Sequence, residues 1–287
     1  MAQILRLKSL ADISHLRIAK LKSATLVFCL FLLFFMISSA YAKSGKITIY
    51  FYSSETSINN FKSLKMEFDS YLSRSGPYEF QPFSERNLFE QHIKGKDKSL
   101  LFISSWHYRK IYKDYSLKPF LVGVRNGKHY QKRVLVAGAR HTDMKTVMKG
   151  PVASASSVQN TRSILKEMFP AKDAADSVRV LTVPKDVDAL MSVGFQMAKS
   201  ALIAESALNN LKMLDPVLSK KMKTVARGSE SLLMVLAIPD SFSTDAEKII
   251  KVIENMKNDP DGMNIIKMLD LDDWKKIDPS DKLKLEG

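Results

Sequence analysis

The stretch "PVASASSVQNTRSIL" (residues 151–165) passes from an apolar edge through small hydroxyl and amide residues into a helical pattern. This order predicts a strand edge, a polar turn and a helix, which is the repeating unit of α/β proteins. Six polar side chains gather in it: Ser154, Ser156, Ser157, Gln159, Asn160 and Thr161. They form either an N-cap with a polar first turn, or a site where free N–H groups and hydroxyls bind an anion.

Strands and helices alternate outward from this unit in both directions. "KITIYFYSS" (46–54) predicts a first strand, and the helical spacing of apolar residues after it predicts a helix that ends at Gly76. "SLLFIS" (99–104) predicts a buried strand. "LKPFLVGVRNGKHYQKRVLVAG" (117–138) predicts two strands joined around the turn pair Asn126–Gly127. Further strands and helices follow up to a helical C-terminal part.

This alternation predicts an α/β fold with two lobes joined by crossing strands, each lobe a mostly parallel sheet covered by helices. We expect residues 1–42 to be a signal peptide, 43–136 with 229–287 to form the first lobe, and 137–228 to form the second. Ligands of open α/β sheets bind at the carboxyl ends of the strands. The predicted ligand site is therefore the crevice between the lobes.

The N-terminal segment has the three parts of a secretory signal. A basic region (1–23) is followed by the uncharged apolar run "ATLVFCLFLLFFMISS" (24–39) and by the small residues of "AYA" (40–42). We expect cleavage before Lys43 and export to the periplasm. The apolar run is shorter than the roughly 20 residues of a spanning helix, so an uncleaved membrane anchor is the second interpretation.

Cysteine content and charge limit the chemistry of the exported part. Cys29 is the only cysteine and lies in the expected signal, which excludes disulfides, thiol nucleophiles and cysteine-based zinc sites from the remainder. The formal charge of the chain is +14, and because the signal holds five basic residues and one acidic residue, the remainder keeps +10. Scattered basic residues attract anions mildly. No nucleic-acid-binding motif is present, so we expect no nucleic-acid partner.

Several segments resemble periplasmic solute-binding proteins of the phosphate, phosphite and phosphonate type, which feed ABC transporters. The likeness lies in "FYSS" (51–54), "GKHYQKRVLV" (127–136), "DMKTVMKGPVASASSVQNT" (143–161), "DVDALMSVGFQMAKSALIAES" (186–206) and "MKNDPDGMNIIKMLDLDDW" (256–274). The resemblance implies the type 2 periplasmic binding fold, a ligand between the lobes and no cofactor. It covers nearly all of the chain beyond the signal.

The sequence also departs from the pattern of that family. Met148 and Lys145 stand where the family has a leucine and an acidic residue. "SASSVQNT" lacks the glycine of the family's serine motif, and "GFQMAKS" lacks its acidic residue. These departures leave the predicted lobes untouched but leave the identity of the ligand open.

The strand ends and the resemblance together predict a set of ligand-binding residues. They are Ser53, Ser54, Ser104, Ser105, Trp106, His107, Tyr108, Tyr130, Ser154, Ser156, Ser157, Gln159, Asn160, Thr161 and Glu205. Each has a plainer interpretation. Residues 104–109 also suit an amphipathic turn with a buried tryptophan, Tyr130 suits a strand aromatic, and Glu205 suits a helix start. Glu55 either accepts a cationic group of a ligand or caps the helix expected to begin near Thr56, and we favour the cap.

Enzyme chemistry has little support in the sequence. Beyond the signal the histidines are His92, His107, His129 and His141, and none stands in an H-E-x-x-H or H-x-H pattern, so we expect no metal site. A G-x-S-x-G elbow and a P-loop are also missing from the sequence. A serine–histidine–acid set assembled through space is left open.

The sequence thus predicts an exported, monomeric solute-binding protein without a cofactor. It would capture a small anionic, phosphonate- or phosphate-like solute between two lobes and present it to an inner-membrane permease of an ABC-type transporter. The alternative is a ligand-sensing or interaction module of the same fold that acts on a membrane partner without transport.

Overall fold

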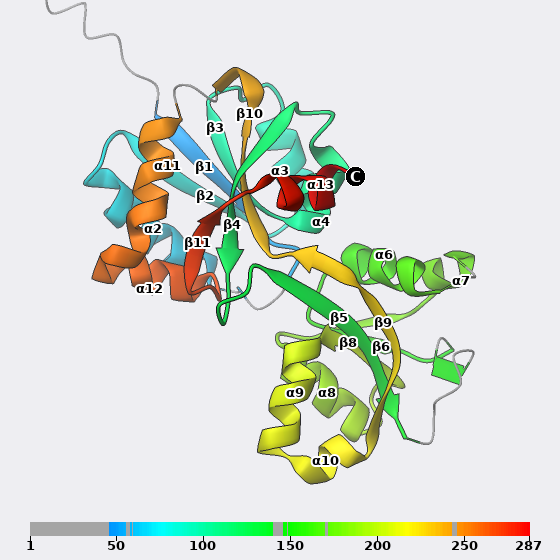
Figure 1. Ribbon diagram of the computed structural model, residues 1–287. Coiled ribbons are helices and arrows are strands. Elements are labelled where there is room, and N and C mark those ends of the chain that lie inside the picture. The colour runs from blue at the N-terminus through cyan, green and yellow to red at the C-terminus, as the bar shows by residue number, and fades with distance from the viewer. Residues whose placement is uncertain are drawn as a thin grey trace, which may run out of the picture. The chain divides into compact units, whose positions relative to one another are not determined.

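The computed structural model describes residues 46–55, 58, 60–139, 146–147, 149–169, 172–242 and 246–287. The predicted signal peptide lies outside these ranges. Lys46–Gly287 contains two β-sheets, each with helices on both faces (Figure 1). Within the described ranges, each helix is too short or too polar to cross a bilayer.

The first sheet has six strands in the order β11–β4–β10–β3–β1–β2. Their bounds are β1 (Ile47–Tyr52), β2 (Tyr78–Phe83), β3 (Ser99–Ser104), β4 (Leu117–Val124), β10 (Met234–Pro239) and β11 (Asp273–Lys276). β1 pairs in parallel with β2 and β3, whereas the pairs β3–β10, β10–β4 and β4–β11 are antiparallel. Successive residues of β1 point to opposite faces, so Ile49 and Phe51 enter one core and Tyr50 and Tyr52 the other.

Six helices bury these two faces of the first sheet. The Phe51 face is covered by α2 (Phe61–Ser73), α11 (Glu247–Glu254) and α12 (Pro260–Met268), and the Tyr50 face by α3 (Arg86–Ile93), α4 (Ser105–Ile111) and α13 (Pro279–Glu286). Two short 3₁₀ helices, η1 (Asp240–Phe242) and η2 (Asn255–Asn258), complete this lobe. In α2, Leu64, Phe68 and Leu72 recur every fourth residue and are fully buried, which explains why that segment packs as a helix.

The second sheet has five strands in the order β7–β6–β8–β5–β9. Their bounds are β5 (Tyr130–Gly138), β6 (Val152–Ser154), β7 (Val180–Thr182), β8 (Ser200–Ala204) and β9 (Met222–Leu232). β6 is parallel to β7 and β8, and β5 is antiparallel to β8 and β9. The helices of this lobe are α6 (Val158–Met168), α7 (Lys172–Asp176), α8 (Asp186–Gly194), α9 (Glu205–Leu214) and α10 (Pro216–Lys220). Its two cores place α8 and α9 against one face and α6 and α7 against the other.

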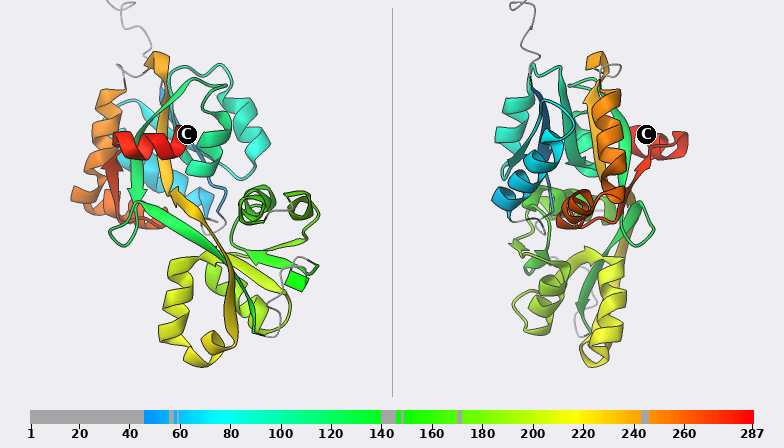
Figure 2. Two further views of the ribbon diagram at one scale, coloured as in Figure 1. Left: turned by 45° about the vertical axis from the view of Figure 1, so that its right-hand side comes forward. Right: turned by 90° about the vertical axis from the view of Figure 1, so that its left-hand side faces the viewer.

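The chain crosses between the sheets twice. The predicted turn at Asn126–Gly127 is confirmed: both residues have positive φ, and Arg125 and Lys128 exchange backbone hydrogen bonds across it. The strands on either side belong to different sheets, β4 to the first and β5 to the second. The return crossing runs from β9 to β10, and the Leu233 N–H donates to the His129 carbonyl at 3.0 Å beside the first crossing. Figure 2 shows the two crossings side by side.

The predicted α/β architecture of two helix-covered sheets joined by crossing strands is therefore confirmed. Each sheet is mixed, because its parallel strands meet antiparallel ones where the crossing strands enter. The predicted lobe boundaries fall within β5 and β9 and stay a prediction. β1 and β6 end in short loops that contain serines, whereas α4 and α9 begin directly after β3 and β8.

Candidate ligand-binding site

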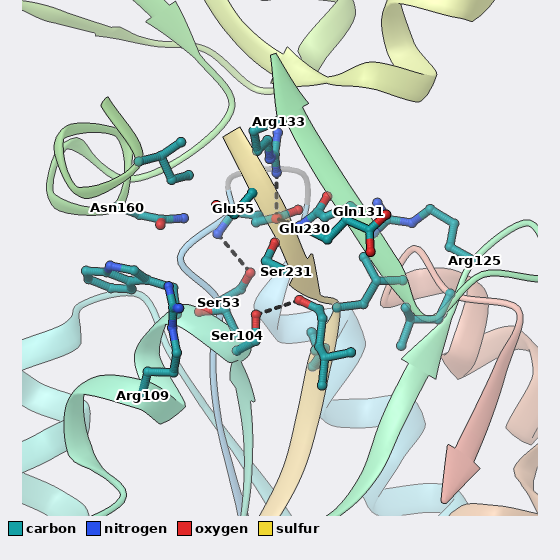
Figure 3. Close-up of a pocket in the computed structure, with 18 of the residues that line it drawn as sticks. Ser53, Glu55, Ser104, Arg109, Arg125, Gln131, Arg133, Asn160, Glu230 and Ser231 are labelled. Atoms are coloured by element: carbon teal, nitrogen blue, oxygen red, sulfur yellow. Dashed lines mark hydrogen bonds and ion pairs between the residues drawn. The ribbon is translucent and has the colours of Figure 1, made fainter. Parts of the chain in front are cut away.

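One cavity lies where residues of both sheets meet, and we call it the interlobe cavity. Its volume is about 70 Å³. Its walls come from the ends of β1 and β3, the start of α4, α6, the crossing strands and the loop before β11. Figure 3 shows Asn160 and Arg109 on one side of it and Gln131 and Arg125 on the other, with Ser53, Ser104 and Ser231 between. A volume of this size holds one or two waters, since each takes about 30 Å³.

A cluster of hydroxyl and amide groups joins the two lobes beside the cavity. The Asn160 Nδ2 group donates to the hydroxyls of Ser54 and Ser156, at 3.2 Å and 3.3 Å. The Ser54 hydroxyl donates to that of Ser104 at 2.9 Å, and the backbone N–H of Ser157 donates to the Ser54 carbonyl at 2.7 Å. Ser54 follows β1 of the first lobe, whereas Asn160 and Ser156 belong to the second. The loop after β1 is thus bonded directly to the start of α6.

Three polar atoms of cavity residues have no hydrogen-bond partner within the described part of the chain. They are Asn160 Oδ1, Trp106 Nε1 and Gln131 Oε1. Asn160 is only 4 % exposed and Trp106 only 8 %. A buried amide oxygen and a buried indole N–H without partners are costly, at about 1–3 kcal/mol each, unless a bound molecule or water supplies the missing bond. The residues that line the cavity therefore include one buried donor and two buried acceptors without a partner in the described part of the chain.

Arg133 of β5 lies between two carboxylates at the edge of the cavity. Its Nη2 donates to Glu55 Oε1 at 2.6 Å, and its Nη1 donates to both oxygens of Asp186, at 3.1 Å and 3.2 Å. Burial alone would raise the pKa of Glu55, but Arg133 and Arg125 outweigh burial, so the pKa lies below its usual range. Burial likewise opposes the charge of Arg133, yet the two carboxylates hold its pKa above the ordinary value. Glu55 and Arg133 are therefore both charged at neutral pH.

The partners of this triad come from both lobes. Glu55 lies in the loop after β1 and also accepts from Gln131 Nε2 at 2.9 Å. Asp186 begins α8 and accepts from the backbone N–H of Ala204 at 2.8 Å. The two carboxylates and one guanidinium sum to a charge of −1. Glu55 and Asp186 thus already occupy the hydrogen-bonding groups of the Arg133 guanidinium.

Two further contacts link α6 to the first lobe farther from the cavity centre. Arg109 of α4 forms an ion pair with Glu167 at 3.3 Å, and Arg86 of α3 donates to Gln159 at 3.0 Å. The side chains of Arg109 and Glu167 are 40 % and 41 % exposed, so this ion pair stabilises the contact only weakly. The lobes are held together by the chain's own groups.

The structure brings part of the predicted set to the cavity. Ser53, Ser104, Ser105, Trp106 and Asn160 line it. Ser54 and Ser156 lie in the bonded cluster behind it. The Ser157 hydroxyl caps α6, Gln159 pairs with Arg86, and the Thr161 hydroxyl donates to the Ser156 carbonyl, so these three act in the helix start or the lobe contact.

The other predicted residues lie elsewhere. His107 is fully buried against Glu90, at 2.8 Å between Nε2 and Oε1, and Tyr108 donates to the Leu117 carbonyl in the first-lobe core. Ser154 is buried in β6. Tyr130 and Glu205 line a separate surface hollow near α9, where Glu205 pairs with Arg227.

Sequence reasoning missed the charged members of the cavity. Glu55 is not a helix cap: Asn60 caps α2, and the Glu55 carboxylate binds Arg133. The sequence could have indicated Gln131 and Arg133 together, because residues two apart on a strand lie on the same face of the sheet. Both side chains point toward the cavity. No local sequence pattern indicates that Arg125 and Arg109 line the cavity. His141 lies outside the described residues.

No model of a known protein family matches the chain, and no curated protein matches it either. Solved structures do. XAC2383 from Xanthomonas citri, solved with bound ATP, is similar with a TM-score of 0.61 at 12 % identity, over 84 % of this chain and 94 % of that one. A binding-protein component of a phosphonate ABC transporter from Pseudomonas aeruginosa gives 0.57 at 12 % identity, over 83 % and 84 %. PhnD1 from Prochlorococcus marinus, solved with methylphosphonate, gives 0.54 at 10 % identity, over 82 % and 93 %.

These likenesses confirm the fold resemblance stated from the sequence. The chain has the two-lobed architecture of periplasmic binding proteins, and phosphonate-binding components are among the structures that share it. The low identities show the fold alone.

Proposed function

We propose that the chain is an exported solute-binding protein that encloses a small anionic solute between its lobes and presents it to an ABC-type transporter in the inner membrane. One observation carries the proposal: a cavity between the two sheets at which a buried guanidinium and unpartnered polar atoms of Asn160 and Trp106 meet. The shared fold supports it, because phosphonate-binding transporter components have this architecture. The predicted signal supports a periplasmic location.

The triad suggests how an anion enters. Glu55 belongs to the first lobe and Arg133 to the second, so opening of the lobes separates them. In the open form the anionic group of a solute takes the place of the Glu55 carboxylate on Arg133. Trp106 then donates to an oxygen of the solute, and Asn160 Oδ1 accepts from its hydroxyl or from a bridging water. Ligand cavities usually exceed about 300 Å³, so the 70 Å³ cavity must widen as Glu55 leaves.

Calorimetric titration with inorganic phosphate and methylphosphonate tests this function. We expect binding to the wild-type protein, and binding at least about tenfold tighter to Glu55→Gln, since that variant removes the competing charge from Arg133. Glu205→Gln is the matched control, because Glu205 lies in the other hollow, and it should bind like the wild type. An absence of heat from both anions with all three proteins would contradict an anionic solute.

A second function is favoured by the direct bonds between the lobes. The bonds of Ser157 to Ser54, Asn160 to Ser54 and Arg109 to Glu167 join the two lobes through protein groups alone. A module that signals to a membrane partner through its closed form has this property. If the titrations show no ligand and the protein still associates with a membrane partner, the sensing or interaction module is the better proposal.

We propose binding rather than catalysis for the interlobe cavity. Among the described residues, no cavity serine is hydrogen-bonded to a histidine ring: the ring of His107 pairs with Glu90, that of His129 with Asp281, and that of His92 packs on Tyr50. The described residues also contain no group of three or more side chains suited to a metal ion. Hydrolysis of a phosphoester by the purified protein that is lost in Ser104→Ala would contradict this proposal.

A further inference from the structure

Five large apolar side chains are exposed at one end of the second lobe. Phe195 and Met197 follow the end of α8, Met213 and Leu214 end α9, and Val217 lies in α10. Their exposed fractions run from 62 % for Met197 to 82 % for Leu214. Single exposed apolar residues are ordinary, but a group of five marks a surface that contacts something else.

The topology explains why these residues gather at one end. α8 begins beside the interlobe cavity, where Asp186 binds Arg133, and α9 begins directly after β8. Both helices run away from the cavity and end at the far side of the lobe, where α10 follows (Figures 1 and 2). The ends of α8 and α10 are in contact, since a Cβ added at Gly194 would lie 2.8 Å from Leu218 Cδ1.

Lysines accompany the apolar residues. Six exposed lysines lie near these helix ends and at the adjacent starts of β6, β8 and β9. They are Lys149, Lys199, Lys212, Lys220, Lys221 and Lys223. Within the described part of the chain, none of the six has a carboxylate within salt-bridge distance. The acidic residue among them is Asp215, whose carboxylate caps α10 by accepting from the Leu218 N–H at 2.8 Å. We call the five apolar residues and six lysines the second-lobe tip.

The residue composition of the tip indicates what kind of partner contacts it. Large apolar side chains beside unpaired lysines are typical of protein surfaces that enter the interface of an anionic bilayer, where each lysine contributes about 1 kcal/mol. A second copy of the chain is disfavoured, because pairing two tips would bring twelve lysines together. We propose that the second-lobe tip docks onto an anionic phospholipid surface. This goes beyond solute binding and does not depend on it.

A tryptophan placed in the tip reports this contact. The full chain carrying Phe195→Trp is mixed with vesicles of phosphatidylglycerol and phosphatidylcholine, or of phosphatidylcholine alone. The native Trp106 and Trp274 are buried and supply a constant background. The matched control is Met66→Trp, at a residue of α2 in the first lobe whose exposure is similar, 62 % against 69 % for Phe195. Any contact made by the N-terminal segment is common to both variants.

We expect a blue shift of the Phe195→Trp emission on anionic vesicles only, absent from Met66→Trp and abolished by Lys220→Glu, Lys221→Glu and Lys223→Glu together. Raising the salt concentration should reduce the shift, because exposed charges are screened. Equal shifts at both tryptophan positions would overturn the proposal. So would a shift that grows with protein concentration without vesicles, which indicates a second copy. No shift under any condition would point to a protein partner and overturn it too.

Discussion

The Arg133 guanidinium lies between the carboxylates of Glu55 and Asp186 and is only 5 % exposed. A buried ion pair gains little over apolar packing, because both charges lose their hydration. Removing one partner is a different matter, since the remaining charge has neither water nor a counter-ion. Removing one member of this triad should therefore lower the stability of the protein as well as change the cavity.

Arg133→Met should lower the free energy of unfolding at pH 7 by about 3 kcal/mol, because it leaves two partly buried carboxylates without their shared counter-ion. Urea denaturation measures the difference. The loss should shrink as the pH falls, because without Arg133 burial raises the pKa of Glu55 and the carboxyl of the variant becomes neutral. Arg227→Met is the control: its partner is the exposed Glu205, so the change should stay below about 1 kcal/mol. A similar small change for Arg133→Met would contradict a buried triad.

His107 gives the fold a dependence on pH. It is fully buried, and burial lowers its pKa to about 4 despite the hydrogen bond to Glu90. In the unfolded chain His107 takes up a proton below about pH 6.5, whereas in the folded chain it does so only near pH 4. The contribution of the neutral ring to stability is therefore fully present above pH 6.5 and is lost as the pH falls to about 4.

The free energy of unfolding should fall by about 3 kcal/mol over this pH range on account of His107, since each pKa unit is worth about 1.4 kcal/mol. His107→Gln keeps a donor for Glu90 but does not titrate, so its stability curve should be flatter over the same range. Proton NMR of the wild-type ring should show no titration above about pH 5. A midpoint near about 6.5 would show that the ring reaches water.

At the scale of elements, the start of α6 shows which residues of the stretch 151–165 cap the helix and which face the cavity. Its N-cap is Ser157, whose hydroxyl accepts from the Asn160 N–H at 3.3 Å. Asn160, one turn inside the helix, instead turns its side chain to the cavity and to Ser54 of the other lobe. The cap and the contact with the cavity are thus made by different residues of one helix start.

We expect Ser157→Ala to lower the free energy of unfolding by about 1 kcal/mol and to leave anion affinity within about twofold. Asn160→Ala should lower the affinity for the anion found by titration by about tenfold or more, because it removes a polar group that contacts the solute. Denaturation and calorimetry on the same two proteins separate the effects. If Ser157→Ala weakens binding as much as Asn160→Ala, the cap itself belongs to the site.

Local patterns predicted the elements of the fold, and long-range contacts account for what they left out. The buried runs of β1 and β3 and the turn at Asn126–Gly127 follow from residue spacing alone. The stretch after β3 forms helix α4 where an amphipathic turn was one interpretation, because Ser104 accepts the His107 N–H as an N-cap. Asn160 was predicted from its helix start, whereas Glu55 and Arg133 meet across 78 positions of sequence, which no local pattern encodes.

At the scale of the whole molecule, the outer contacts between the lobes are few and partly exposed. Arg86–Gln159 and Arg109–Glu167 are the outer contacts of α6 with the first lobe. The crossings at 125–130 and 232–234 are short, so the lobes can move only about this narrow connection. A solute shifts the equilibrium between open and closed forms by its preference for one of them.

The double variant Arg86→Ala and Arg109→Ala should therefore open the molecule without unfolding it. Each exposed contact contributes about 0.5–1 kcal/mol, so losing both shifts the ratio of open to closed forms by about 5- to 30-fold. Small-angle X-ray scattering should show a larger radius of gyration than for the wild type, and saturating anion should reduce it again. Arg74→Ala with Lys257→Ala is the control, because both residues form ion pairs inside the first lobe. An unchanged radius in the first variant would mean that Ser54, Asn160 and the Arg133 triad alone hold the lobes closed.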